Sequence, residues 1–573
     1  MRKWTIDTLQ ASYRKGEIEP SQVMEAIVEQ ADAEKEMNIW ITPPDLEFIE
    51  PYLTALENKD QAIAPLWGVP FAVKDNIDVA GLPTTAGCEG YTYTPTKHAT
   101  VVERLIEAGA IPVGKTNLDQ FATGLVGTRS PYGETHNALR SELISGGSSS
   151  GSAVSVATGQ VVFALGTDTA GSGRIPAALN GLIGFKPSLG SWPVPGLVPA
   201  CASLDCISVF AHDLQDVQLV HEVVQGIDEQ DKWSKPFLDQ ATTLPKKIVL
   251  PNRPLTFFGP YQHEYQAAWE ETKQRLLSLS LNVEYIDIDL FLEAAAILYD
   301  GPWVAERWAA VGDFISEHEE AVFPVTMQVL SGGKPKNHSA ASLFKAVHRL
   351  KEIQLAVKHL LEDAVLVLPT CGGTWTREQV RDNPIETNSK MGLYTNHCNL
   401  LDMCAIAVPA GEAAAQLPFG ITIFGMSGQD HLILRTAALF FNQQLVEVAV
   451  CGLHMRGLPF ETQMQEHGAF FCEETVTAPV YRMVKIPGVI EKPGLIKNIA
   501  TGESIELEVW KMPIHQFGKF AASIPSPLGI GKVELADGRE VSGFLCEGYI
   551  TNNPNVQDIT KSRSWRKISG NHV

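Results

Sequence analysis

The spacing of apolar and polar residues changes along the chain. In the first forty residues it predicts two amphipathic helices, the second over 22–34 with Ser21 as its N-cap. Between residues 65 and 190, short apolar runs alternate with Gly- and Ser-rich turns and helical stretches, which is typical of an α/β domain around a buried sheet. Strands are predicted at 69–73, 110–113 and 161–165, and a helix at 101–108.

The second half of the chain changes from helical to β-type patterning. Residues 262–363 are mostly helical, and after about residue 450 short β-type segments are separated by turns. This change predicts a larger α/β domain over 1–450 and a smaller α+β domain over 451–573. The individual elements expected here are helices at 267–279, 340–361 and 430–442 and strands at 364–368, 419–424, 479–486, 504–510 and 529–535.

Composition agrees with two folded domains and narrows the partners. The 573 residues exceed what one hydrophobic core usually supports, and 45% hydrophobic against 19% charged residues is a globular composition. The net charge of −21 argues against nucleic acid, whose phosphates require a basic surface. No apolar run approaches the ~20 residues that span a bilayer. No apolar block follows the basic pair Arg2-Lys3, so we also expect no signal peptide.

The cysteines indicate neither disulfides nor a metal. There are nine in the chain, with no Cys-x-x-Cys pair and no histidine spacing suited to zinc. We therefore expect buried, reduced thiols in a cytoplasmic protein, with no bound metal.

Two Gly-rich motifs match known signatures without the context that those sites need. Residues 109–116 match the P-loop, but a helix is predicted before the first glycine, a strand lies inside the loop, and Pro112 lacks an N–H. Residues 147–151 match the nucleophile elbow of α/β-hydrolases, yet 140–146 form only a weak strand and no histidine is singled out. We expect no nucleotide site and keep the elbow as an alternative.

A third combination of motifs is more specific. Lys74 ends a predicted strand, Ser148 lies in the Gly- and Ser-rich run 146–153, and Ser172 follows within 166–176. In this order and spacing, and with 184–187 reading Gly-Phe-Lys-Pro, these residues resemble the Ser–Ser–Lys triad of the amidase signature family. The resemblance implies a central mixed β-sheet surrounded by helices.

The same resemblance assigns roles that suit amide hydrolysis. An amide carbonyl is a poor electrophile, so the reaction needs an activated nucleophile and a stabilised oxyanion. The family pattern makes Ser172 the nucleophile, Ser148 a proton relay behind a cis peptide bond, and Lys74 the general base. Lys74 must then be neutral, and burial beside Phe71 and Val73 lowers a lysine pKa in that direction.

The loop that carries Ser172 is expected to bind the oxyanion. Asp168 and Arg174 flank this loop, and we expect them to pair and hold its shape. The backbone N–H groups implied as oxyanion donors are those of Thr169, Ala170, Gly171 and Ser172.

Three further stretches resemble the allophanate hydrolases of this family. They are 114–133, in which Gln120 stands where other members often carry an acid, 198–208, and 298–307. In the last stretch the resemblance makes Tyr299 and Arg307 hold the substrate carboxylate, with the Gly124 backbone as a further contact. A guanidinium suits a bidentate grip on a carboxylate, although without the resemblance the residues fit a surface arginine paired with an acid equally well.

The C-terminal region resembles the second domain of the same enzymes at 526–538 and 543–547. That resemblance implies a fold similar to γ-glutamyl cyclotransferases and a part in decarboxylating the first product. His454 is our candidate for its acid/base residue. A structural histidine near a domain junction is the alternative.

Taken together, these resemblances imply hydrolysis of allophanate, an anion, to ammonia and carbon dioxide without a cofactor. The resemblance places such an enzyme downstream of urea carboxylase or of a biuret hydrolase, and the helical faces in 262–363 suggest a homodimer. The alternatives are another amidase of the family, the amidase component of a tRNA-dependent amidotransferase, or a catalytically silent scaffold.

Overall fold

The structure, a computed structural model, describes residues 4–236, 244–279, 281–441, 445–467, 469–488 and 490–568. Contacts between residues divide it into two units. The larger consists of Met1–Thr272 and Leu281–Ala438, and the smaller of Lys273–Ser280 and Leu439–Val573. Among the described residues, no helix has both the length and the apolar character needed to cross a bilayer.

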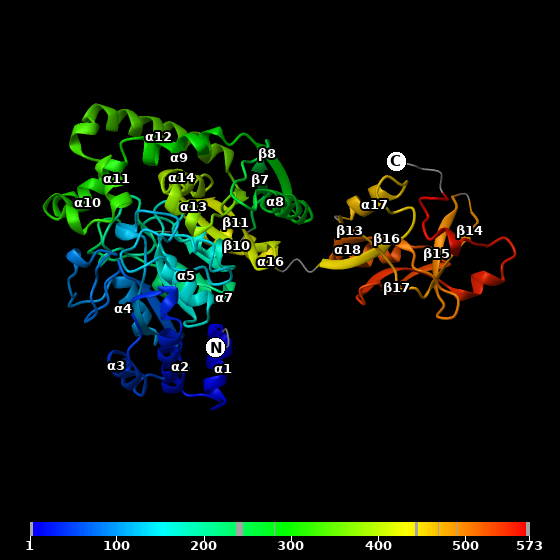
Figure 1. Cartoon of the computed structure of the whole chain (residues 1–573), viewed down its shortest axis with the longest axis horizontal. Coiled ribbons are helices and arrows are strands. Elements are labelled where there is room, and N and C mark those ends of the chain that lie inside the picture. Colours follow the sequence, from blue (N-terminus) through cyan, green and yellow to red (C-terminus); the bar gives the residue numbers. More distant parts are fainter. Residues whose placement is uncertain are drawn as a thin grey trace. The chain divides into compact units, whose positions relative to one another are not determined.

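The larger unit is built on an eleven-stranded mixed sheet, surrounded by helices (Figure 1). Its strand order is β1-β3-β2-β4-β6-β5-β10-β11-β9-β7-β8. The strands are β1 (Trp40–Thr42), β2 (Pro70–Lys74), β3 (Ile111–Thr116), β4 (Phe163–Thr167), β5 (Ile183–Lys186), β6 (Ile207–Ala211), β7 (Lys247–Pro251), β8 (Asn282–Ile286), β9 (Ala364–Pro369), β10 (Met403–Ala414) and β11 (Leu417–Met426).

Helices connect these strands and cover the sheet. Buried side chains of α9, α12 and the strands β9 and β10 form one continuous hydrophobic cluster. The helices are α1 (Ile6–Arg14), α2 (Pro20–Ala33), α3 (Leu46–Leu56), α4 (Thr100–Glu107), α5 (Ser150–Ala157), α6 (Ile175–Leu179), α7 (Leu214–Val224), α8 (Gln262–Leu277), α9 (Asp289–Asp300), α10 (Val304–Glu317), α11 (Pro324–Ser331), α12 (Ala340–Leu360), α13 (Arg377–Asp382), α14 (Glu386–Met391), α15 (His397–Leu400) and α16 (Asp430–Phe441).

Three neighbouring strands, β2, β3 and β4, position the chemistry. β2 pairs in parallel with both β3 and β4, and every residue of the three strands is buried. Strands buried on both faces read as continuous apolar runs, which is why the sequence showed them clearly. Because the strands are parallel, their carboxyl ends meet at one edge of the sheet, and Lys74 and Thr167 end β2 and β4 there.

Most predicted elements are found within a few residues of their expected ends, and β3 occupies the would-be P-loop as expected. One expectation about these elements is wrong. The second helix begins at Pro20 with Glu19 as its N-cap, because proline is favoured in the first turn, so Ser21 is already helical. Residues 140–146 form only isolated bridges. The predicted end of α16, Asn442, lies outside the described residues.

The smaller unit contains two sheets. The five-stranded sheet has the order β13-β16-β12-β18-β17, and the three-stranded sheet β15-β14-β19. Strand β12 belongs to this unit's sheet. The smaller unit therefore includes a strand that the sequence prediction, with its division after residue 450, assigned to the larger domain. The elements are β12 (Leu445–Val450), α17 (Glu461–Glu466), β13 (Phe470–Val476), β14 (Tyr481–Ile486), β15 (Lys492–Lys497), β16 (Glu506–Pro513), α18 (Ile514–Ala522), β17 (Leu528–Glu534), β18 (Glu540–Cys546) and β19 (Gln557–Asp558).

Candidate active site

Lys74 lies at the centre of a buried cluster of hydroxyl groups. Its Nζ donates to Ser148 Oγ at 2.7 Å and to Thr167 Oγ1 at 2.6 Å. Thr167 reaches it because β4 runs parallel to β2, with Val73 opposite Leu165. Among the described residues, no carboxylate lies within ion-pair distance of Lys74. The lysine and Ser148 thus form the contact that the sequence predicted.

Ser148 is held by the turn that leads into α5. The peptide bond between Gly147 and Ser148 is cis, as the resemblance implied. The next residue ties this turn to the sheet, because Ser149 Oγ donates to the Thr167 carbonyl at 3.1 Å and accepts from the Thr167 N–H at 3.2 Å. These two hydrogen bonds fix the position of the turn that carries Ser148 relative to the end of β4.

The surroundings of Lys74 favour its neutral form. Burial lowers the pKa of its amine to about 7, against the opposing charges of Asp119, Asp205 and Asp168, while the charge of Arg307 lowers it further. A lysine with this pKa is substantially unprotonated near neutral pH, so it is able to accept a proton.

The Asp168 carboxylate holds the loop that follows β4 in a closed conformation. Its carboxylate accepts from the N–H groups of Gly171 at 2.8 Å and Gly173 at 3.1 Å, and from Arg174 Nε at 2.8 Å and Nη2 at 2.9 Å. Burial disfavours the Asp168 charge, but the Arg174 guanidinium together with Lys186 and the Gly171 N–H outweighs it, so the pKa of Asp168 is lowered. The expected Asp168–Arg174 pair is confirmed. Gly171 has a φ of +127°, where a side chain would also collide with Thr395.

One of the N–H groups implied as oxyanion donors already has a hydrogen-bond partner. The Gly171 N–H donates to the Asp168 carboxylate and is therefore not directed towards a substrate. Within the described part of the chain, no hydrogen bond occupies the N–H groups of Thr169, Ala170 or Ser172. These three groups are the ones that this conformation leaves for a substrate oxygen.

Ser172 and Arg307 both contact the segment 123–124. Ser172 is 3% exposed, and its Oγ lies 3.5 Å from the Gly124 carbonyl oxygen. Arg307, on α10 and 2% exposed, donates from Nη1 to Thr123 Oγ1 at 3.2 Å. The structure therefore brings the predicted nucleophile, Gly124 and the predicted carboxylate-binding arginine together. Tyr299 lies in the last turn of α9, and its side chain is outside the described residues.

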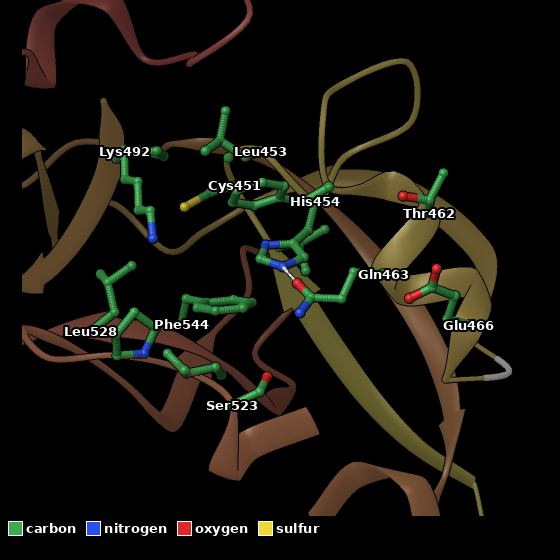
Figure 2. Close-up of a pocket in the computed structure, with 16 residues that line it drawn as sticks. Cys451, Leu453, His454, Thr462, Gln463, Glu466, Lys492, Ser523, Leu528 and Phe544 are labelled. Atoms are coloured by element: carbon green, nitrogen blue, oxygen red, sulfur yellow. Dashed lines mark hydrogen bonds between the residues drawn. The ribbon is translucent and has the colours of Figure 1, made fainter. Parts of the chain in front are cut away.

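His454 lies in the smaller unit, in a cavity of about 410 Å³ (Figure 2). Gln463 Oε1 lies 2.8 Å from His454 Nε2, and the imidazole stacks on Phe544 with ring centroids 4.9 Å apart. Burial, which outweighs the Gln463 hydrogen bond, and the charge of Lys492 lower the pKa of His454. The histidine is thus part of a formed pocket and is available to a ligand.

Three groups near Lys74 were missed by sequence reasoning. Thr167 is the second partner of the amine, and its place at the end of a predicted strand was the available signal. Asp119 is buried and accepts from the N–H groups of Val126, Gly127 and Arg129, which shapes the segment beside Gly124. Gln120, which was already noted in the sequence, follows Asp119. Its amide nitrogen donates to the carbonyls of Gly87 and Ala321, and its amide oxygen accepts from the Phe323 N–H.

Asp205 is the third missed group. It accepts from Thr169 Oγ1 at 2.6 Å and from the N–H groups of Ala200 and Cys201. Burial raises the pKa of its carboxyl to about 6, against these hydrogen bonds and the charge of Arg307. Asp205 therefore fixes Thr169, the first residue of the loop that leads to Ser172. As for metals, the described residues contain no group of three or more His, Cys, Asp or Glu that could hold an ion.

Comparison with known proteins identifies the class. Residues 22–434 match the family model described as Amidase, and the chain belongs to this family. Residues 446–570 match a second model, the allophanate hydrolase C-terminal domain. Both domains together are similar to the crystal structure of Kluyveromyces lactis allophanate hydrolase, with 37% identity over 99% of each chain and a TM-score of 0.72.

Two other relatives show which parts of the chain share this similarity. The urea amidolyase of Saccharomyces cerevisiae is 39% identical over 95% of this chain, but this covers 32% of that protein, so the chain spans about a third of its length. A glutamyl-tRNA(Gln) amidotransferase component from Lactobacillus acidophilus is 42% identical over 39% of this chain and 46% of its own. Similarity over both domains thus extends to allophanate hydrolase and urea amidolyase.

Proposed function

We propose that the chain hydrolyses allophanate, with Ser172 as nucleophile. Neutral Lys74 takes a proton from Ser148, which takes one from Ser172, and Ser172 Oγ attacks the terminal amide carbon. The N–H groups of Thr169, Ala170 and Ser172 stabilise the oxyanion. The protonated relay returns its proton to the leaving nitrogen, ammonia departs, and water clears the acyl-enzyme to give a dicarboxylated amine.

The observation that carries this proposal is the fully buried Lys74, bonded to the Ser148 hydroxyl with a pKa of about 7. A lysine held in hydroxyl groups and away from carboxylates is suited to act as a base. The two-domain similarity to an allophanate hydrolase supports the choice of substrate.

The test is ammonia release from allophanate by the purified chain, with Ser172→Ala as the matched variant. The wild-type chain should release ammonia without a partner, and Ser172→Ala should reduce turnover by at least about 10³-fold. The amidase component of an amidotransferase would depend on partner chains. A wild-type chain that leaves allophanate intact would refute the proposal.

Arg307 supports an anionic substrate. It is a buried guanidinium, bonded to Thr123 beside the residue whose carbonyl faces Ser172. We expect Arg307→Ala to raise KM for allophanate about 10- to 100-fold and to change KM for propionamide little, because only allophanate carries a carboxylate. Equal changes for both substrates would reject a carboxylate-binding role. Tyr299 is proposed to assist it.

The remaining elements of the proposal concern setting and assembly. We assign the C-terminal domain, with His454, to decarboxylation of the first product. The urea amidolyase relatives support a supply of allophanate by a urea carboxylase, with a biuret hydrolase as the other source. The free cysteines support a reducing cytoplasm. A homodimer through the helices of 262–363 is proposed, which light scattering would test.

A further inference from the structure

The cavity of the C-terminal domain is built from elements far apart in the sequence. His454 follows β12, Gln463 lies on α17, Lys492 begins β15 and Phe544 lies on β18. Figure 2 shows the Lys492 amine and the His454 ring directed into the same space beside Phe544. A cation and an imidazole thus face one partly apolar cavity.

Lys492 differs from the lysines near it. Lys485 pairs with Glu491 at 2.6 Å, and Lys497, at the other end of β15, pairs with Glu534 at 3.1 Å. Within the described ranges no carboxylate pairs with Lys492, whose Nζ lies 5.8 Å from the centroid of the Phe460 ring. A cation without a counterion, placed against apolar walls, attracts an anion more strongly than a solvated lysine does.

Gln463 determines which nitrogen of His454 carries the hydrogen in the neutral ring. An amide oxygen only accepts, so the 2.8 Å contact with Gln463 Oε1 requires the hydrogen on Nε2. In the neutral imidazole Nδ1 is then unprotonated, and no hydrogen bond among the described residues occupies it. Nδ1 is therefore the atom that gains and gives a proton towards a ligand.

We propose that this cavity binds the dicarboxylated amine, with Lys492 pairing with its retained carboxylate and Gln463 positioning His454. This inference rests on the proposed function for the identity of the ligand. The departing carboxylate must lose its charge as it becomes carbon dioxide, so a cation paired with that group would oppose the reaction. Lys492 therefore suits the carboxylate that stays, and the apolar side near Leu528 and Phe544 suits neutral carbon dioxide.

The proton balance follows from this placement. Protonated His454 gives its Nδ1 proton to the amine nitrogen, the N–C bond breaks with its electron pair moving to nitrogen, and carbon dioxide leaves. The products are carbon dioxide and carbamate, and the neutral imidazole regains a proton from water. The other titratable groups that line the cavity are Cys451, Glu466 and Lys492.

The first experiment measures binding of malonate, in which a methylene replaces the amine nitrogen. Titration calorimetry on the full chain carrying Arg307→Ala removes the cation of the amidase site as a competitor. Lys492→Gln should weaken malonate binding at least about tenfold, Lys492→Arg should restore most of it, and Lys497→Gln on the same strand should change it less than about twofold. Malonate binding that is absent from the parent protein, or unchanged in Lys492→Gln, would overturn the inference.

The second experiment separates the positioning role of Gln463 from a structural one. Ammonia and carbon dioxide release are followed together from pH 5 to 9, with His454→Asn as the background of unaided decomposition. A carboxylate at position 463 stabilises the imidazolium, so Gln463→Glu should extend carbon dioxide release about one pH unit upward. The matched variant Gln465→Glu, two positions further along α17, should not.

The outcomes distinguish the two proposals. The first equivalent of ammonia, which the amidase step releases, should form at the same rate in all variants at 463, 465, 492 and 497, whereas the second equivalent follows decarboxylation because carbamate must form before it. If the wild-type chain releases no ammonia, the amidase proposal fails and the malonate result still decides whether the cavity binds dianions. If release of the first equivalent of ammonia is intact and the carbon dioxide profile of Gln463→Glu equals that of the wild type, the positioning role alone is refuted.

Discussion

Two buried lysines at the ends of adjacent strands, Lys74 on β2 and Lys115 on β3, have opposite surroundings. Lys74 contacts two hydroxyl groups, whereas Lys115 lies 3.6 Å from the Asp75 carboxylate and donates to Thr84 Oγ1 at 2.9 Å. Burial lowers the pKa of both amines, but at Lys115 the first opposing charge is the adjacent Asp75. The comparison teaches that burial alone does not make a base, because a contacting carboxylate turns the same residue type into a structural ion pair.

The largest expected difference between the two lysines is in turnover. Lys74→Met should reduce ammonia release from allophanate by at least about 10³-fold, because no other group described near Ser148 is placed to take its proton. Its Tm should stay close to that of the wild type, since methionine fills a similar volume and the groups that lose their hydrogen-bond partner are two neutral hydroxyls. Steady-state kinetics and thermal denaturation measure both. Retained turnover in Lys74→Met would contradict the assignment of the base.

The next effect is on stability, at Lys115. Lys115→Met leaves the Asp75 carboxylate buried without its cation, which should lower the free energy of unfolding by about 3 kcal/mol. Denaturant titration measures it, with Lys74→Met as the matched control. The variant should keep most of its turnover at a temperature where it is folded. A larger loss of stability in Lys74→Met than in Lys115→Met would reverse the comparison.

The smallest effect is a shift of the pH profile. Neutral Lys74 is the active form in the proposed mechanism, so kcat/KM should fall about tenfold per unit below a pH of about 7. The Asp119 charge raises the Lys74 pKa and the Arg307 charge lowers it. With propionamide as substrate, Asp119→Asn should therefore move the acid limb down and Arg307→Met should move it up, each by about half a unit. Shifts of the same sign would show that these charges do not act on the base.

Local pattern and family spacing account for what the sequence revealed. Strand β2 was visible as an apolar run that ends in a charge, and Ser148 and Ser172 by the Gly-rich segments around them. The use of the Gly171 N–H by Asp168, the contact of Thr167 with Lys74, and the hydrogen bonds of Asp119 were not predictable. They depend on how loops fold back after the sheet has formed. The proposed role of Lys492 was not predictable for the same reason, because it depends on where α17 and β18 lie in the folded domain.

The helices between β8 and β9 supply Arg307 and none of the groups that move protons. Lys74, Ser148 and Ser172, the residues proposed to move the proton, all come from chain segments before residue 175. In the proposed function, recognition of the carboxylate and proton transfer therefore come from different stretches of the chain. Substituting the stretch from α9 to α12 with that of another family member should redirect the same reaction to a different amide, so new specificity is accessible without rebuilding the catalyst.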